Sequence, residues 1–424
     1  MNTDVVTREK IIINGKSVLK GKIKIGGAKN SALALICAAV MADGEVVLEK
    51  VPEINDVMVM LDIISSLGAK VTWQESETIK INPPEKITSH PPYSMVKKLR
   101  ASNLLLGPML ARYGSAKVAL PGGCNIGTRP MDLHFKGLTG LGAQLRLERG
   151  CILAEAGRLK GSRIYLDFPS VGATENLMIA ACLAEGQTII ENVAKEPEIV
   201  DLANFLNCMG AKVRGAGTDV IKIQGVERLS GCSRYCVIPD RIEAGTFMVA
   251  AAATGGDITL ENVISTHLEP VSAKLREANV EIIEGEDSIR VIADKPLTPI
   301  DIKTMPYPGF PTDLQSQMMG MLSTVAGTSI IIENIFENRF QVADELKRMG
   351  ANIKVEGRLA VIEGVEALQG TQVKATDLRA GAALVVAALM ANGRTEIYHP
   401  DYIYRGYHDF EDKLRELGAD ITSV

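Results

Sequence analysis

Aromatic side chains are scarce in this chain of 424 residues: they make up 4 %, with a single tryptophan, Trp73. Proteins that bind single-stranded nucleic acid usually stack bases on several aromatic rings, so the low content argues against that class. Runs of like charge are also missing, and the formal net charge is −5. We therefore expect no nucleic-acid partner, although a local basic pocket is still allowed.

Long apolar runs are missing too. Stretches such as MIAACLAEG are too short and too interrupted to span a bilayer. The first ten residues, MNTDVVTREK, contain no apolar core of a signal peptide. These features predict a cytoplasmic protein that does not enter a membrane.

The seven cysteines form no CxxC motif and no Cys/His cluster with the spacing of zinc ligands. Cys232 and Cys236 stand close together, but no second pair completes a metal site. We therefore predict no metal and no other cofactor. Thiols of a cytosolic protein are expected to be reduced.

The chain does contain a sixfold internal repeat. A signature of the type LGAKV or MGANI begins at residues 67, 141, 209, 277, 349 and 417. Each is preceded by an Ala/Leu-rich segment, a glycine turn and a β-branched segment, as in ALALICAAVMADGEVVLEKV. Apolar spacings of three and four predict helices, and the glycine that follows them predicts a left-handed cap. Self-similarity at this period indicates an array of small α/β modules.

The ends of the chain indicate how the modules divide. A chain of this length is expected to form two domains of about 200 residues. The sixth module stops at LGADITSV, and the N-terminal EKIIINGKSVLKGKIKIGG has the pattern of the strands that it lacks. We predict one domain of residues 1–21 plus 239–424, with repeats four to six closed by the N-terminal strand, and a second of residues 22–238, with repeats one to three. Two linkers favour a hinged pair with a cleft.

Basic residues recur at equivalent ends of the repeats. The segments that begin the first helices carry N-cap formers, and helix N-termini favour anions. Four basic residues stand beside these starts and three follow strand ends: Lys29, Arg100, Arg241 and Arg379, and Arg129, Arg339 and Arg405. Each cation could pair with a carboxylate nearby in the sequence, as in PDRIE and TDLR. Their recurrence favours a substrate with several negative charges.

Cys124 differs from the other cysteines, for which a structural role is the default. It lies in LPGGCNIGTRPMDLH, after a predicted strand, where small residues permit mobility and close backbone approach. Arg129, five residues on, favours the thiolate. From its residues alone, this cysteine is either a structural thiol or a reactive one.

Several motifs together carry a family resemblance. They include GGAKNSALALICAAVMADG, LPGGCNIGTRPMDLH, SVGATENLMIAACLAEG, PDRIEAGTF, FPTDLQSQ, TDLRAGAALV and RGYHDFEDKLRELGADI. Over nearly the whole chain the sequence closely resembles the UDP-N-acetylglucosamine 1-carboxyvinyltransferase family of enolpyruvyl transferases. The resemblance implies a two-domain inside-out α/β barrel of six βαβαββ repeats, three per domain.

The resemblance also implies a reaction. The enolpyruvyl group of phosphoenolpyruvate passes to the 3′-hydroxyl of UDP-N-acetylglucosamine through a tetrahedral intermediate, and phosphate leaves. This is the first committed step of peptidoglycan synthesis, which serves cell wall biogenesis, cell shape and division. No cofactor, metal or obligate protein partner is implied.

The same resemblance assigns roles to residues. Cys124 matches the proton donor, which is the target of fosfomycin, and Asp313 matches the group that takes the hydroxyl proton. Lys29, Arg405 and Asp377 complete the catalytic set. Phosphoenolpyruvate would contact Lys29, Asn30, Arg129, Arg339, Arg379 and Arg405. The nucleotide sugar would contact Asn30, Arg100, Arg129, Asp132, Leu133, His134, Ser170, Val171, Gly172, Asp313 and Ile335. One position departs from some members of the family, which have a lysine where this chain has Phe168.

Other interpretations remain open for single residues and for the whole chain. His134 could be a packing histidine at a strand end, Glu196 and Glu198 could be helix N-terminal acids, and Asp313 could be a helix cap. The shikimate-pathway enolpyruvyl transferase shares the implied fold but typically uses no loop cysteine of this type. A non-catalytic repeat scaffold would repeat its surface residues evenly, whereas Cys124 and Asp313 each occur in one unit.

Overall fold

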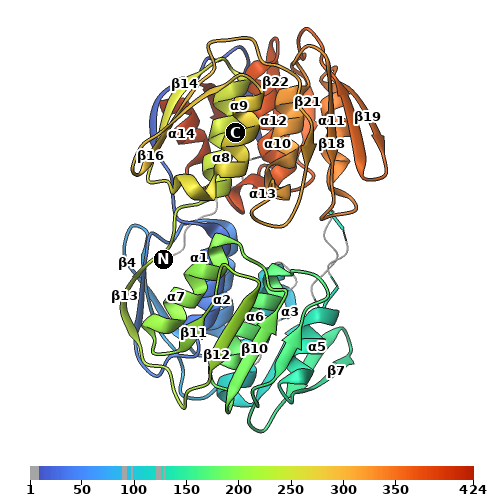
Figure 1. Ribbon diagram of the computed structural model, residues 1–424. Coiled ribbons are helices and arrows are strands. Elements are labelled where there is room, and N and C mark those ends of the chain that lie inside the picture. The colour runs from blue at the N-terminus through green and yellow to red at the C-terminus, as the bar shows by residue number, and fades with distance from the viewer. Residues whose placement is uncertain (1–8, 88–92, 97–98, 121–125, 128–129) are drawn as a thin grey trace. The chain divides into compact units, whose positions relative to one another are not determined.

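The computed structural model describes the chain except residues 1–8, 88–92, 97–98, 121–125 and 128–129 (Figure 1). Contacts between Cα atoms divide it into two units. Unit 1 comprises the described residues up to Gly26 and from Pro239 to Val424, together with Ile126 and Gly127. Unit 2 comprises the other described residues between Gly27 and Ile238.

The described strands of unit 2 form three small sheets. They are β3 (Val46–Glu49), β4 (Lys70–Glu75), β5 (Thr78–Asn82), β6 (Ser115–Ala119), β7 (Gln144–Glu148), β8 (Cys151–Glu155), β9 (Arg163–Tyr165), β10 (Gln187–Glu191), β11 (Lys212–Arg214), β12 (Val220–Gln224) and β13 (Cys232–Cys236). The strand orders are β13-β3-β5-β4, β6-β8-β7 and β11-β12-β10-β9. In each four-stranded sheet one outer strand is parallel to its neighbour and the other pairs are antiparallel.

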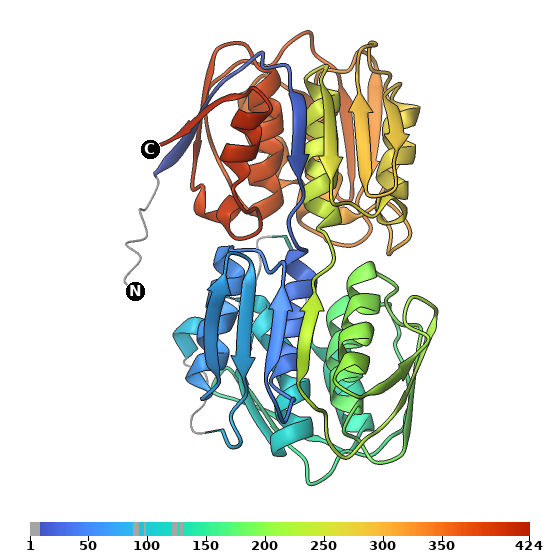
Figure 2. The ribbon, with the colours of Figure 1, turned by 90° about the vertical axis from the view of Figure 1, so that its left-hand side faces the viewer.

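Unit 1 repeats this plan in three four-stranded sheets. Its strands are β1 (Lys10–Asn14), β2 (Lys20–Lys24), β14 (Asp257–Glu261), β15 (Glu281–Glu284), β16 (Ser288–Ile292), β17 (Ile302–Lys303), β18 (Thr328–Ile332), β19 (Asn352–Glu356), β20 (Leu359–Glu363), β21 (Gln372–Lys374), β22 (Arg394–Tyr398) and β23 (Asp420–Ser423). The orders are β15-β16-β14-β2, β17-β18-β20-β19 and β21-β22-β1-β23. Strand β1 lies antiparallel between β22 and β23, so the N-terminal strand closes the sheet of the sixth repeat (Figure 2).

Helices connect the strands of both units. Unit 2 contains α1 (Lys29–Ala39), α2 (Asn55–Ser66), α3 (Tyr93–Val96), η1 (Arg100–Leu105), α4 (Leu106–Tyr113), α5 (Asp132–Gly140), α6 (Val171–Ala181) and α7 (Pro197–Cys208). Unit 1 contains α8 (Arg241–Ala253), η2 (Ser265–His267), α9 (Glu269–Glu277), η3 (Thr312–Leu314), α10 (Gln315–Leu322), η4 (Arg339–Gln341), α11 (Val342–Arg348), α12 (Leu378–Met390), α13 (Asp401–Tyr404) and α14 (Phe410–Glu416).

The first helix of a repeat is buried on every side. All residues of α8 from Ile242 to Ala252 and all residues of α12 from Arg379 to Leu389 are buried. A helix in that position must be apolar all round, and the sequences GTFMVAAAA and GAALVVAALM meet this requirement. Helices α8, α10 and α12 pack against one another, with the sheets of unit 1 around them (Figures 1 and 2). This arrangement confirms the predicted inside-out α/β fold.

The glycine of the repeat signature ends the second helix of each repeat. It adopts a positive φ angle, the conformation that glycine reaches without strain. The six positions are Gly68 (φ 107°), Gly142 (94°), Gly210 (98°), Asn279 (71°), Gly350 (94°) and Gly418 (95°). The predicted left-handed caps are thus confirmed, with asparagine taking the place of glycine once.

Side-chain caps at the helix starts are fewer than the sequence predicts. Ser170, Asp240 and Asp377 accept hydrogen bonds from the backbone N–H groups that begin α6, α8 and α12. Helices α1, η1 and η3 begin after Ala28, Leu99 and Pro311, without a side-chain cap. At these three starts the prediction is wrong, because the polar residues of the motif lie inside the first turn.

The chain passes between the units at two places, which are close in space. The backbone N–H of Ala28 donates to the carbonyl of Ile238 (2.7 Å), and that of Asp240 donates to the carbonyl of Gly26 (2.9 Å). Gly27 is required here because a Cβ at this position would lie 1.8 Å from the carbonyl oxygen of Lys50.

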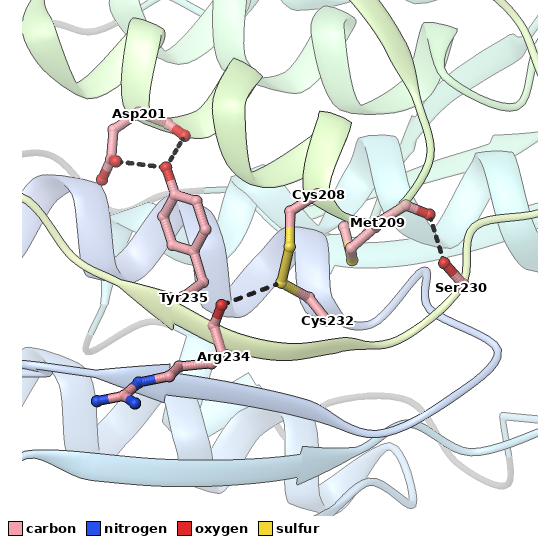
Figure 3. Close-up of a disulfide and its surroundings, with 7 residues drawn as sticks. All are labelled: Asp201, Cys208, Met209, Ser230, Cys232, Arg234 and Tyr235. Atoms are coloured by element: carbon pink, nitrogen blue, oxygen red, sulfur yellow. Dashed lines mark hydrogen bonds between the residues drawn. A yellow bond between two sulfur atoms is a disulfide. The ribbon is translucent and has the colours of Figure 1, made fainter.

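The prediction that the thiols are reduced is wrong for two cysteines. Cys208, the last residue of α7, forms a disulfide with Cys232, the first residue of β13 (Figure 3). Their Cα atoms are 6.0 Å apart across a sequence separation of 24 residues. The sequence could not show this, because the pairing depends on α7 packing against β13. Cys37 and Cys182 are buried free thiols, as predicted.

Within the described residues, no helix has the length and apolarity needed to cross a membrane. In the same part of the chain, His, Cys, Asp and Glu side chains form no group of three that could hold a metal ion.

Candidate active site

In unit 1 the carboxylate of Asp313 lies between two arginine side chains. Its Oδ1 accepts a hydrogen bond from Arg339 Nη2 (2.9 Å), and its Oδ2 accepts one from Arg379 Nη2 (3.0 Å). The side chains of Arg339 and Arg379 are 2 % and 5 % exposed, whereas that of Asp313 is 27 % exposed. These three side chains carry two positive charges and one negative charge. The net positive charge favours the binding of an anionic ligand.

This geometry corrects two of the open interpretations. Asp313 is not a helix cap, because both carboxylate oxygens bind arginines and the N-cap of η3 is Pro311. Arg379 does not pair with Asp377, its neighbour in the sequence. Asp377 instead caps α12, accepting from the backbone N–H groups of Arg379 and Ala380.

A buried polar network adjoins this group. The guanidinium of Arg379 lies 5.5 Å from the ring centroid of Tyr407. The Tyr407 hydroxyl is 2.8 Å from Thr246 Oγ1 and accepts from Gln317 Nε2 (3.3 Å), which also donates to the Asp313 carbonyl (3.0 Å). Burial lowers the pKa of Arg379, but the Asp313 carboxylate, together with Tyr407 and Asp240, outweighs burial and leaves that pKa raised. The arginine is therefore a permanent cation.

Other predicted residues of unit 1 lie on elements close in sequence to this group. Arg405 is the half-buried C-cap residue of α13, two positions before Tyr407. Ile335 is half-buried, and its backbone N–H donates to Glu333 Oε1 (2.8 Å). The direct contacts described above join Asp313 to Arg339 and to Arg379.

The described part of the cysteine loop contacts the segment that precedes Arg339. The backbone N–H of Asn338 donates to the carbonyl of Ile126 (3.1 Å). Gly127 has a φ of 141°, and a Cβ there would lie 2.2 Å from Glu337 Oε2. Cys124 and Arg129 lie outside the described residues.

In unit 2 the predicted cation Lys29 is buried and paired. It is the first residue of α1, where a positive charge opposes the helix dipole. Its Nζ lies 2.7 Å from Oδ2 of Asp56, in the first turn of α2, and the two side chains are 10 % and 7 % exposed. Asn30, the next residue, is exposed to solvent.

A second group of predicted residues meets at the start of α6. His134 is buried, and its Nδ1 is 3.1 Å from Asn176 Nδ2, so Nδ1 is the acceptor and the proton is assigned to Nε2. Both Nε2 and Cε1 lie 3.5 Å from the position of a Cβ on Gly172, and Ser170 caps the same turn. Burial lowers the pKa of His134 to about 4, which keeps the ring neutral. His134 lies in the first turn of α5, so its placement at a strand end is wrong.

The remaining predicted contacts of the nucleotide sugar flank this group. Asp132 is exposed, Leu133 is half-buried, and both belong to the first turn of α5. Val171 begins α6, and Arg100 begins η1. The structure thus places Ser170, Gly172 and His134 together.

Glu196 and Glu198 hold the positions expected of helix N-terminal acids. Glu196 is the N-cap residue of α7, and Glu198 lies in its first turn. Glu175 on α6 is fully buried, and burial, followed by the charges of Glu198 and Glu196, raises the pKa of its carboxyl well above the usual value. These acids therefore form an interior cluster rather than a solvated face.

A family model described as EPSP synthase (3-phosphoshikimate 1-carboxyvinyltransferase) matches residues 13–414. The chain belongs to this family. Its curated relatives include a UDP-N-acetylglucosamine 1-carboxyvinyltransferase 2 from Carboxydothermus hydrogenoformans, which is 58 % identical over 98 % of this chain and 99 % of that protein. A UDP-N-acetylglucosamine 1-carboxyvinyltransferase 1 from Caldanaerobacter subterraneus subsp. tengcongensis is 55 % identical, over 98 % of this chain and 99 % of its own.

Solved structures share the fold at lower identity. The enolpyruvyl transferase NikO from Streptomyces tendae superposes with a TM-score of 0.88 at 26 % identity, over 98 % of this chain and 99 % of that one. An EPSP synthase from Acinetobacter baumannii gives 0.76 at 21 % identity, over 99 % and 100 % of the two chains, and shows the fold alone. The resemblance predicted from the sequence is confirmed, and so is the fold.

Several side chains around the site escaped prediction. Asp56, Tyr407 and Gln317 bind the predicted residues directly. A signal existed for Asp56, because a lysine buried at a helix N-terminus needs a carboxylate partner. Tyr407 stands in the motif RGYHDF beside Arg405, but nothing in the sequence tells that it lies against Arg379.

Proposed function

We propose that this chain transfers the enolpyruvyl group of phosphoenolpyruvate to the 3′-hydroxyl of UDP-N-acetylglucosamine and releases phosphate. The observation that carries the proposal is the identity of 53–58 % over 98 % of the chain to relatives named UDP-N-acetylglucosamine 1-carboxyvinyltransferase. The reaction opens peptidoglycan synthesis, and we place it in the cytoplasm.

The chemistry needs one proton donor and one proton acceptor. The sugar oxygen O3 bonds to C2 of phosphoenolpyruvate as its own proton is removed and a proton is added to C3. The tetrahedral intermediate then loses phosphate from C2 and a proton from C3, which restores the double bond. We assign the donor role to Cys124 and the acceptor role to Asp313, as the resemblance implies. Lys29, Arg405 and Asp377 assist.

The group around Asp313 supports this assignment. Phosphoenolpyruvate carries a phosphate and a carboxylate, and guanidinium groups bind both in a forked geometry. Arg339 and Arg379 are fixed by their bonds to Asp313, whose carboxylate remains 27 % exposed and so accessible to a hydroxyl group. We assign both arginines, with Lys29, Asn30, Arg129 and Arg405, to phosphoenolpyruvate.

The start of α6 supports a site for the nucleotide sugar. Helix N-termini bind anions such as a diphosphate through free N–H groups. Ser170, Val171 and Gly172 form this turn in unit 2, and the neutral His134 lies against it. We further propose that the enzyme has two domains joined by two linkers: residues 1–21 plus 239–424, and residues 22–238, which carry the Cys124 loop.

A phosphate-release assay tests the proposal. Purified protein is incubated with phosphoenolpyruvate and either UDP-N-acetylglucosamine or shikimate 3-phosphate. We expect phosphate release with the nucleotide sugar and none above background with shikimate 3-phosphate. Release with shikimate 3-phosphate alone would assign the chain to the other activity of the family, and release with neither would contradict both.

A further inference from the structure

Asp201, on α7, is a buried aspartate with no role in the proposed reaction. Its side chain receives three hydrogen bonds. Oδ2 accepts from the hydroxyl of Ser31 and from the backbone N–H of Ile238 (3.4 Å), and Oδ1 accepts from the hydroxyl of Tyr235 (2.7 Å). The residue is 3 % exposed. A carboxylate surrounded by donors is a satisfied acceptor, whereas an unpaired one would be costly at this depth.

The three donors come from separate parts of unit 2. Ser31 lies in the first turn of α1, two residues after Lys29 and one after Asn30. Tyr235 lies on β13, and Ile238 is the last residue of unit 2 before the chain enters unit 1. The Asp201 carboxylate therefore joins the start of α1 to the strand and the linker that end unit 2.

Helix α7 is itself held firmly against β13. Figure 3 shows two attachments along this pair: the Asp201–Tyr235 hydrogen bonds, and the Cys208–Cys232 disulfide towards the other end. Phe205 also packs edge-on against the Tyr235 ring, with centroids 5.1 Å apart. Ser31 is thus tied to a rigid platform.

The start of α1 is held by contacts of three kinds. Its N-cap residue is Ala28, which has no side chain that could cap the helix. The backbone N–H of Ala28 donates to the carbonyl of Ile238, and the backbone N–H of Ile238 donates to Asp201. The Lys29–Asp56 ion pair restrains the lysine side chain, whereas the Ser31–Asp201 bond restrains the turn that carries Lys29 and Asn30.

We propose that Asp201 is a positioning residue, which holds the first turn of α1 so that Lys29 and Asn30 meet phosphoenolpyruvate in the productive geometry. The inference rests on the proposed function, which assigns these two residues to that substrate. Small displacements of a substrate-binding group reduce turnover strongly, so the loss of one hydrogen bond to this turn becomes measurable.

Two near-isosteric variants test the proposal. Ser31→Ala removes the hydroxyl from α1 and leaves Asp201 bonded to Tyr235 and Ile238. Tyr235→Phe removes a bond from the platform and keeps the ring against Phe205. For both we expect the KM for phosphoenolpyruvate to rise about tenfold and the KM for UDP-N-acetylglucosamine to rise less than about threefold. Both residues of the turn contact phosphoenolpyruvate, whereas only Asn30 also contacts the nucleotide sugar.

Ser323→Ala is the matched control. Ser323 is fully buried at the end of α10, and its hydroxyl donates to the Met319 carbonyl of the same helix (2.8 Å). We expect a lower Tm and unchanged KM values. Asp201→Asn, which keeps an acceptor oxygen for Ser31, should restore most of the activity lost in Asp201→Ala, and Ser31→Ala should add nothing to Asp201→Ala.

The outcomes separate this proposal from the proposed function. If the wild-type enzyme is active, but Ser31→Ala and Tyr235→Phe lower Tm as the control does and keep both KM values within about twofold, Asp201 is merely structural. If Ser31→Ala does not fold, Tyr235→Phe decides alone by the same criterion. An inactive wild-type enzyme would contradict the proposed function and, with it, the assignment of Lys29 and Asn30.

Discussion

The carboxylate of Asp313 lies 3.0 Å from Nη2 of Arg379, although 66 positions separate the two residues. Asp313 comes from the fifth repeat and Arg379 from the sixth, and Arg339 completes the group from its other side. The charge that a substrate meets here therefore depends on contacts between neighbouring repeats. In the proposed reaction, one aspartate both accepts a proton and fixes two cations.

The exchange Asp313→Asn removes the charge and keeps the shape of this side chain. We expect kcat to fall at least about a hundredfold, because a general base contributes about 10²- to 10⁴-fold. Both asparagine and alanine leave the two buried guanidinium groups without an anion, at a cost of about 3–5 kcal/mol. Asparagine is the better test because its amide oxygen still accepts one of the two arginine hydrogen bonds. Phosphate release, beside a thermal melt and a binding titration with UDP-N-acetylglucosamine, provides the measurement.

Asp257→Asn is the control for that variant. Asp257, on β14, takes two hydrogen bonds from Arg290 (2.8 and 2.7 Å) on an exposed face of unit 1. It should leave kcat within about twofold, because surface pairs contribute little even to stability. An Asp313→Asn enzyme that melts lower but turns over normally would mean that the proton acceptor is another group.

Gly127→Ala probes the contact between the cysteine loop and the segment before Arg339. The new Cβ would lie 2.2 Å from Glu337 Oε2 and 3.3 Å from the Glu337 backbone nitrogen, at a φ of 141°. Since both the contact and the φ angle oppose a side chain, we expect kcat/KM to fall at least about tenfold. Steady-state rates with both substrates give the result.

Gly142→Ala separates the two effects at position 127. Gly142 also has a positive φ, 94°, but a Cβ there meets no atom within 4 Å. It should lower Tm and leave kcat/KM nearly unchanged. Equal losses of activity in the two variants would show that the contact with Glu337 is irrelevant to turnover.

His134 should make the stability of the protein depend on pH. Burial lowers its pKa from 6.5 to about 4, so the folded state binds fewer protons than the unfolded state between those values. Its contribution is complete above pH 6.5 and is lost as the pH falls through this range, by about 2 kcal/mol between pH 7 and pH 5. In denaturant titrations, the free energy of unfolding of His134→Gln should change less between pH 7 and pH 5 than that of the wild type. Glu175, whose raised pKa acts in the opposite direction, is present in both proteins and so does not affect the comparison. Equal slopes would contradict the assignment of a neutral, buried ring.

The sequence predicts the features that depend on local pattern. Six copies of one signature indicate six modules. The residue after each second helix, glycine in five repeats and asparagine in one, is a cap because its place at the helix end requires a positive φ. Pairings between modules are not predictable in this way. Arg379 stands beside Asp377 in the sequence but binds Asp313, and Cys208 meets Cys232 only because α7 packs on β13. For the same reason Asp201, which links three segments, carries no signature of its own.

Reaction with fosfomycin should single out Cys124. Burial raises the pKa of Cys182 to about 12 and also raises the pKa values of Cys37 and Cys236, so these thiols are poor nucleophiles. We expect one adduct per chain by intact-mass measurement, and peptide mapping should place it on Cys124. An adduct on another cysteine would remove the case for Cys124 as the reactive thiol.

Cys124→Asp and Cys124→Ala distinguish proton donation from nucleophilic reactivity. The aspartate variant should lose the fosfomycin adduct yet keep more activity than the alanine variant, because a carboxylic acid can still donate a proton. A Cys124→Asp enzyme that remains fully sensitive to fosfomycin would exclude this residue as the site of alkylation.

The structure of the nucleotide product decides whether the proposed transfer takes place. Phosphoenolpyruvate and UDP-N-acetylglucosamine are incubated with the enzyme, and the nucleotide product is examined by mass spectrometry and by NMR. We expect a UDP-N-acetylglucosamine that carries one enolpyruvyl ether at O3, formed in equal amount to the phosphate released. Phosphate accompanied by free pyruvate and unchanged nucleotide sugar would contradict it.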